Sequence, residues 1–258
     1  MNDQGLHHSG DVTAADWLGP RLRRFGSAVA AVVPDGFPAY VRILHPVRGT
    51  SDRPVRWAEV AAWSRRRMHR LVQFDAITRP AGAAPTEPAP WDGQPPPDGN
   101  LPAKLLRILC ATLAEHTSTP DSCWFCLWDG YGWLHGSPSV VIFGPSGSVP
   151  VPPAFPDEVL HGPRVRLPGR DYLLFAGPLA AAPELGWTDP YGVFLPQSPN
   201  LFWPQDRAWC VASEIDLFCT LVAGSEALAE ALVGDPRLEA WRVHPADPIA
   251  FDSDQINT

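Results

Sequence analysis

The clearest alternation of apolar and polar positions in this chain runs from Trp209 to Leu221. The odd-numbered positions there are mostly apolar, whereas the even-numbered ones include Glu214 and Asp216. Alternation with a period of two is typical of a strand that buries one face. An unbroken strand of this length would be unusual, so we expect a bulge or break near Asp216.

The residues after this alternation are predicted to form a helix and a final strand. Ser225 is a favourable N-cap, because its side chain can accept a hydrogen bond from the first turn. Leu228 and Leu232 then lie one turn apart on the expected core face, and Gly234 ends the helix. We expect the last strand over 238–243.

Two more helices are predicted earlier in the chain. The apolar stripe with helical spacing over 101–116 is formed by leucines and one threonine: Leu105, Leu106, Leu109, Thr112 and Leu113. A second helix is expected over 56–70. It carries a basic run, which is typical of a solvated face or an intramolecular partner for carboxylates, and less often of a phosphate site.

Short runs rich in β-branched and aromatic residues predict further strands, over 40–44, 123–128, 164–167 and 170–176. The run 123–128 is too apolar to have a wet face, which favours a central position in a sheet. Strands and helices do not alternate along the chain, so the pattern predicts an α+β fold with a largely antiparallel sheet.

Proline and glycine add long loops to this picture. The chain has 31 prolines and 21 glycines among 258 residues, and eight of the prolines fall in 79–102. That segment is either a surface loop or a linker, and Trp91 in its middle is expected to pin it to the core. We expect one domain over 15–243, a disordered tail over 1–14 and a C-terminal tail over 244–258.

The charge distribution argues against some classes of partner. The net charge is −8, and residues 80–258 hold 8 basic and 21 acidic side chains. Such an acidic balance makes nucleic acid an unlikely main partner. No segment approaches the roughly 18 apolar residues of a membrane span, and no signal peptide is recognised. We therefore expect a soluble cytoplasmic protein without membrane contact.

The cysteines do not predict a metal or redox centre. Cys123 and Cys126 fall on a predicted strand and face opposite sides, as do Cys210 and Cys219. A four-thiolate zinc site would need turn-borne pairs, and no helix follows to activate a thiol. An odd number of five cysteines also does not suggest a disulfide framework. We expect no cofactor and no metal.

No nucleophile with a base and an orienting carboxylate is recognisable, so no residue is assigned a catalytic role. The best candidate for binding is the segment from Trp203 to Trp209, which encloses Asp206 and Arg207. Tryptophan is a favoured interface residue, and arginine is the natural partner of carboxylates. The competing interpretation is core packing around an internal Asp–Arg ion pair.

Two further positions extend this candidate site. Glu214 and Asp216 are predicted on one strand face, roughly 7 Å apart. Such a pair is able to bind a hard cation or to do acid–base work, although a solvated sheet face has the same pattern. Trp91, Trp187 and Tyr191 are carried by loops and are candidates for a shared aromatic surface.

Three phrases carry a resemblance to a known family: C-W-F-C-L-W-D-G-Y-G, R-D-Y-L-L-F-A-G-P and Q-S-P-N-L-F-W-P-Q-D-R-A-W-C-V-A-S-E-I-D, at 123–132, 170–178 and 197–216. On these the chain resembles a family of cytosolic proteins from high-GC Gram-positive bacteria, over most of 15–243. That family implies no established activity, so no functional residue is carried over. A looser analogy is to small α+β immunity proteins that bind and neutralise toxins, whose motifs are absent here.

These observations favour a non-enzymatic binding or interaction module, immunity-like or regulatory, with another protein as its partner. The candidate binding residues are Trp203, Asp206, Arg207, Trp209, Glu214 and Asp216. The alternative is a carboxylate-dependent hydrolase that uses Asp206, Glu214 or Asp216. The sequence leaves the oligomeric state open.

Overall fold

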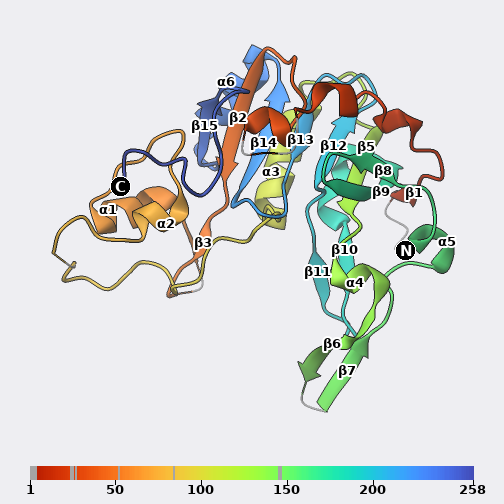
Figure 1. Cartoon of the computed structure of the whole chain (residues 1–258), viewed down its shortest axis with the longest axis horizontal. Coiled ribbons are helices and arrows are strands. Elements are labelled where there is room, and N and C mark those ends of the chain that lie inside the picture. Colours follow the sequence, from red (N-terminus) through yellow and green to blue (C-terminus); the bar gives the residue numbers. More distant parts are fainter. Residues whose placement is uncertain (1–4, 24–25, 27, 52, 84, 145–146) are drawn as a thin grey trace.

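A nine-stranded antiparallel sheet forms the centre of the molecule (Figure 1). The computed structural model describes residues 5–23, 26, 28–51, 53–83, 85–144 and 147–258, with the backbone alone over 137–150. The strand order is β1-β9-β5-β12-β13-β14-β2-β15, and β8 pairs with β9. The strands are β1 (His7–His8), β2 (Ala39–Leu44), β5 (Cys123–Trp128), β8 (Val165–Leu167), β9 (Arg170–Gly177), β12 (Leu201–Pro204), β13 (Cys210–Ala212), β14 (Cys219–Gly224) and β15 (Ala240–Val243). The predicted α+β class with a largely antiparallel sheet is confirmed.

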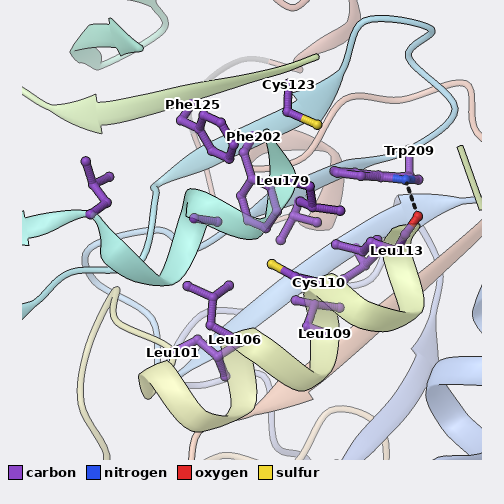
Figure 2. Packing of buried hydrophobic residues seen from close by; sticks show 14 of the residues in the cluster. Leu101, Leu106, Leu109, Cys110, Leu113, Cys123, Phe125, Leu179, Phe202 and Trp209 are labelled. Atoms are coloured by element: carbon purple, nitrogen blue, oxygen red, sulfur yellow. Dashed lines mark hydrogen bonds between the residues drawn. The ribbon is translucent and has the colours of Figure 1, made fainter. Parts of the chain in front are cut away.

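Both faces of this sheet are buried. Helices α3 (Ala103–Ala114) and α6 (Glu226–Gly234) supply apolar side chains to the core on one face. Figure 2 shows this packing, where leucines of α3 meet Phe125 and Phe202 of the sheet. The opposite face is covered by the N-terminal segment, whose Leu18 and Val33 pack with side chains of the sheet. This explains why the strands read as apolar on both sides.

The long alternation is divided into two strands, as expected. Strands β13 and β14 pair with each other in antiparallel fashion, with Ala212 opposite Leu221. The loop 213–218 reverses the chain at the predicted break near Asp216. Helix α6 then begins as predicted, because the hydroxyl of Ser225 accepts a hydrogen bond from the backbone N–H of Leu228.

The helix expected over 56–70 is shorter than predicted. Helix α1 (Trp57–Ser64) ends because Arg65 takes the left-handed conformation, with φ of 60°. The basic run 65–70 is therefore not helical. Helix α1 packs with the short α2 (Phe74–Ile77) and with β3 (Val47–Arg48) and β4 (Pro54–Val55) in a third apolar cluster.

The proline-rich segment 79–102 lies against this third cluster. Trp91 is buried there, and its ring meets that of Trp63 edge to face at 5.1 Å between centroids. A β-bridge between Gly49 and Trp91 adds a backbone link. The role expected for Trp91 is thus confirmed.

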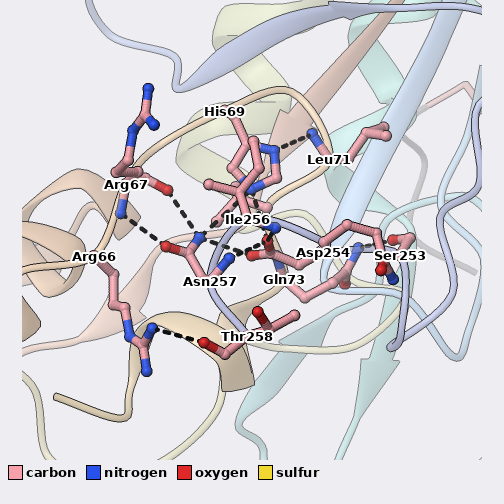
Figure 3. Close-up of polar contacts among 12 residues, drawn as sticks. Arg66, Arg67, His69, Leu71, Gln73, Ser253, Asp254, Ile256, Asn257 and Thr258 are labelled. Atoms are coloured by element: carbon pink, nitrogen blue, oxygen red, sulfur yellow. Dashed lines mark hydrogen bonds and ion pairs between the residues drawn. The ribbon is translucent and has the colours of Figure 1, made fainter. Parts of the chain in front are cut away.

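The two segments expected as tails make specific contacts. Residues 7 and 8 form β1 at the edge of the sheet, whereas residues 1–4 lie outside the described residues. In the C-terminal segment the side chain of Asn257 accepts from the backbone N–H of Arg67 and donates to its carbonyl, at 2.9 Å each (Figure 3). Asp254 contacts His69 at 2.8 Å. The basic run therefore has an intramolecular partner.

Two hairpins lie outside the large sheet. Residues 137–151 form a hairpin of β6 (Ser137–Gly144) and β7 (Gly147–Val151), which projects from the body of the molecule (Figure 1). Helices α4 (Gly132–His135) and α5 (Asp157–Leu160) flank it in the chain. A second hairpin pairs β10 (Gly186–Thr188) with β11 (Phe194–Pro196).

Candidate functional site

The two tryptophans at the centre of the sequence-based candidate are core residues. Trp203 is 1% exposed and meets Trp17 edge to face, at 5.9 Å between ring centroids. Trp209 is fully buried on the other side of the sheet, and its indole N–H donates to the carbonyl of Leu113 at 3.0 Å (Figure 2). A ligand reaches neither indole, because packing around the sheet encloses both.

Asp206 and Arg207 turn to different partners rather than to each other. Asp206 accepts hydrogen bonds from the hydroxyl of Thr117 and from the backbone N–H of Ser118, at 2.8 and 2.7 Å. Burial opposes ionisation of Asp206, but hydrogen bonds from Ser118 and Thr117 outweigh it and lower the pKa of the carboxyl. Arg207 lies over the ring of Trp17 at 5.4 Å. Asp206 therefore ties the β12–β13 turn to the segment after α3.

Glu214 and Asp216 do come together, around Arg170 at the start of β9. The guanidinium of Arg170 lies 3.0 Å from the Glu214 carboxylate and 2.6 Å from that of Asp216. Burial raises the pKa of Glu214, and Arg170 offsets part of that effect. Both carboxylates leave the predicted strand face, because they belong to the loop 213–218. Both carboxylates thus form ion pairs with the same guanidinium, that of Arg170.

A ladder of four aromatic rings leads away from this ion-pair cluster. The guanidinium of Arg170 lies 5.7 Å from the ring of Trp128, which meets Tyr131 edge to face at 5.2 Å. Tyr131 stacks on Trp133 at 5.7 Å, and Trp133 stacks on Trp187 at 6.0 Å with an interplanar angle of 9°. All four rings are half-buried. The ladder connects the sheet to the β10–β11 hairpin.

The tip and second strand of that hairpin expose four large apolar side chains, and the half-buried Trp187 of the first strand pairs with the last of them, Leu195. We call these five residues the hairpin face: Trp187, Tyr191, Val193, Phe194 and Leu195. The last four side chains are 39–54% exposed and make up four of the seven large apolar side chains exposed in the described parts of the chain. A hollow of about 260 Å³ adjoins the patch and is lined in part by Phe155, Trp187 and Phe194. Because side chains alternate along a strand, Leu195 shares a face with its partner Trp187, whereas Phe194 points to the other face and lines the hollow. Several exposed apolar side chains on one short hairpin mark a binding surface better than isolated ones do.

Sequence reasoning found this surface only in part. Trp187 and Tyr191 stood out as loop-borne aromatic residues, but Val193, Phe194 and Leu195 did not. The signal available was a run of three apolar residues between a glycine and a proline, in a segment without basic residues. Such a short run does not distinguish a buried strand from an exposed hairpin.

A chain of hydrogen bonds surrounds the fully buried His45. Its Nδ1 lies 2.7 Å from the carbonyl of Pro97, and its Nε2 lies 2.9 Å from the hydroxyl of Thr220. The Thr220 hydroxyl is in turn 2.7 Å from that of Ser213. Because a carbonyl only accepts, Nδ1 carries the proton and Nε2 accepts from Thr220. Burial lowers the pKa of His45 to about 4, so the ring is neutral near pH 7.

The five cysteines are all buried and unpaired. Burial raises the pKa of Cys110 and of Cys123 to about 12, which disfavours the reactive thiolate. Among the described residues, no group of three or more His, Cys, Asp or Glu side chains is arranged to hold a metal ion. In the same residues, no helix is long and apolar enough to cross a membrane.

Comparison with known proteins gives no further guide to the site. No protein-family model, no curated protein and no solved structure matches this chain.

Proposed function

We propose that this chain is a protein-binding module and that the hairpin face docks its partner. The observation that carries the proposal is that four exposed apolar side chains fall within 191–195, next to a hollow that Phe155, Trp187 and Phe194 help to line. Aromatic and aliphatic side chains around a pocket are typical of the energetic centre of a protein interface.

The hairpin is held in shape before any partner arrives. The carboxylate of Asp189 accepts hydrogen bonds from the backbone N–H groups of Tyr191 and Val193, at 2.8 Å each. Trp187 is stacked on the aromatic ladder behind the hairpin. A surface ordered in this way loses little conformational entropy on binding, which favours affinity.

Charge indicates the kind of partner. Residues 178–200 contain Glu184 and Asp189 but no Arg or Lys, within a half of the chain that is strongly acidic. A complementary surface has an apolar centre and a basic rim, since opposite potentials speed association and exclude wrong partners. Such a partner suits an immunity-like or a regulatory module. A cytoplasmic setting belongs to the same proposal, because five unpaired cysteines fit a reducing compartment.

The hydrolase alternative has less support. It needs Asp206 in one cleft with Glu214 or Asp216, yet β13 separates Asp206 from the other two along the chain. Asp206 is engaged by Thr117 and Ser118, whereas Glu214 and Asp216 are engaged by Arg170. Carboxylates that are tied to separate structural partners favour a role in folding over acid–base chemistry.

The test compares Phe194→Asp with Val233→Asp. Phe194 and Val233 are exposed to similar degrees, 39% and 42%, but Val233 lies on α6 outside the hairpin face. Each full-length variant is used to capture proteins from native lysate, and the captured protein is then purified and titrated calorimetrically. We expect Phe194→Asp to weaken binding by about 2 kcal/mol or more and Val233→Asp to leave it unchanged.

Two outcomes would count against the hairpin face as a site for a different protein. Equal binding by both variants would place the interface elsewhere. Self-association of the wild type that Phe194→Asp abolishes, measured by sedimentation, would make a second copy of the chain the occupant.

A further inference from the structure

A second concave surface lies far from the hairpin face in the chain and has the opposite electrostatic character. It is a groove of about 660 Å³ between the β3–β4 hairpin and the first two turns of α3, with the segment from α6 to β15 at one end. We call it the basic groove. Its volume falls in the range of about 300–1,000 Å³ that is usual for small-molecule sites.

The walls of the basic groove are apolar and stiff. Leu105 and Ile108 of α3 are half-buried, because they pack against the core on one side and line the groove on the other. Five prolines complete the walls: Pro46, Pro54, Pro97, Pro102 and Pro236. Proline has no N–H and a restricted backbone, so these walls offer few donors and change shape little. Pro97 is held further by the hydrogen bond of its carbonyl to His45.

The rim of the groove is cationic, although the chain as a whole is acidic. Five of the lining residues are basic and one, Glu239, is acidic. The basic ones are Arg48, Arg53, Arg56, Lys104 and Arg237. Glu239 is turned toward α1, where its carboxylate accepts from the backbone N–H groups of Trp57 and Ala58 at 2.7 and 2.8 Å.

The five basic side chains of the groove differ in whether a carboxylate pairs with them. Arg48, Arg53 and Arg237 each contact a carboxylate, that of Asp92, Glu59 and Asp235, at 2.7, 2.7 and 2.6 Å. Arg56 donates instead to the carbonyls of Pro236 and Leu238. In the described parts of the chain, no carboxylate lies within 4 Å of the Lys104 ammonium. Among the described residues, Lys104 and Arg56 are thus the two rim cations whose side chains pair with no carboxylate within 4 Å.

We propose that the basic groove binds a small amphipathic carboxylate, with its hydrocarbon body on Leu105 and Ile108 and its head at Lys104 and Arg56. Apolar walls favour a water-poor body, and cations at the rim favour an anionic head. The site is separate from the hairpin face and is independent of the proposed protein partner. Failure of one proposal therefore leaves the other standing.

The test titrates the full chain with decanoate and with decanol, both kept below the concentration at which they aggregate. Lys104→Glu reverses the charge at the rim, and Leu105→Trp fills the groove. Arg107→Glu is the matched control, since Arg107 lies on the same helix and contacts Glu184 outside the groove. We expect decanoate to bind, Lys104→Glu to raise its Kd about tenfold or more, and Arg107→Glu to change it by less than about twofold.

A second measurement uses the fact that Lys104 is the only lysine in the chain. An amine-reactive acetylating ester modifies this side chain and the N-terminal amine, and mass spectrometry separates the two. Decanoate is expected to slow acetylation of Lys104 several-fold and to leave the N-terminal amine unaffected. Leu105→Trp should remove that protection.

The proposal is overturned if decanoate does not bind, if decanol binds equally well, or if Lys104→Glu binds decanoate like the wild type. It is also overturned if a hexaglutamate peptide protects Lys104 where decanoate does not. That result would assign the groove to an acidic peptide.

Discussion

At the scale of single residues, the burial of His45 makes the stability of the fold depend on pH. The ring is fully buried, and both nitrogens are engaged by Pro97 and Thr220. Its pKa is lowered from 6.5 to about 4 because burial disfavours the charged ring. Between these two values the unfolded chain binds the proton and the folded chain does not, so acidification favours unfolding. This pKa difference is worth about 3 kcal/mol.

We therefore predict that His45→Gln flattens the pH dependence of stability between pH 6.5 and 4. The free energy of urea unfolding of the wild type should fall by about 3 kcal/mol more than that of the variant over this interval. His161→Gln is the control, because His161 is exposed at the end of α5. Equal slopes for His45→Gln and the wild type would contradict the buried neutral ring.

Asn257 is a second residue whose role depends on one side-chain amide. This amide bonds to both backbone groups of Arg67 and to the carboxylate of Asp254 (Figure 3). Burial opposes ionisation of Asp254, but hydrogen bonds from Asn257, Ile256 and Gln73 outweigh it and lower the pKa to about 2. In the folded chain the carboxylate stays ionised down to about pH 2, so its stabilising contribution is complete above about pH 4 and is lost as the pH falls toward 2.

We predict that Asn257→Ala lowers the free energy of unfolding by about 1–3 kcal/mol at pH 7, because it leaves buried partners unsatisfied. Gln255→Ala, at an exposed position two residues away, should change it by less than about 0.5 kcal/mol. Chemical denaturation measures both. An unchanged free energy of unfolding in Asn257→Ala would show that the C-terminal segment does not contribute to stability.

At the scale of elements, helix α3 separates two kinds of apolar position. Leu109 is fully buried in the core, whereas the half-buried Leu105 packs against that core and also lines the basic groove. Helical spacing predicted both as members of one stripe, since it reports a face of the helix and not what covers that face. The structure thus gives two positions of the stripe, one turn apart, different surroundings.

Leu109→Ala is accordingly expected to cost about 2–5 kcal/mol of unfolding free energy, as is usual for a cavity in a packed core. Leu105→Ala is the same substitution on the same helix, and it should lower the free energy of unfolding by less than about 1 kcal/mol. Thermal or urea denaturation separates the two outcomes. Similar losses would mean that Leu105 is part of the core.

Single helices and strands were predictable where one feature of the sequence dominates, such as a run of apolar residues or a helix cap. The run 123–128 is uniformly apolar because β5 lies between β9 and β12, and the Ser225 cap marks the start of α6. The end of α1 was not predictable, because Arg65 adopts a left-handed conformation that nothing in its residue type requires. The β10–β11 hairpin was missed because its strands are three residues each.

At the scale of the whole molecule, contacts between segments far apart in the sequence decide which side chains are buried and which are exposed. Strand β2 lies between β14 and β15, although it ends 175 residues before β14 begins and 196 before β15 begins, and no local pattern specifies this order. The aromatic ladder likewise joins Trp128, Tyr131 and Trp133 to Trp187 from another part of the chain. The tryptophan-rich segment 203–209 became core, and the accessible aromatic surface formed elsewhere.

The central claim is that the hairpin face contacts a partner protein, and site-specific photo-crosslinking tests it most directly. The crosslinking residue p-benzoylphenylalanine is placed at position 194 of the full chain, or at position 233 as the control, and the cells are irradiated. We expect a discrete crosslinked protein from position 194 and none from position 233. No crosslink at 194, or the same product at both positions, would contradict the claim.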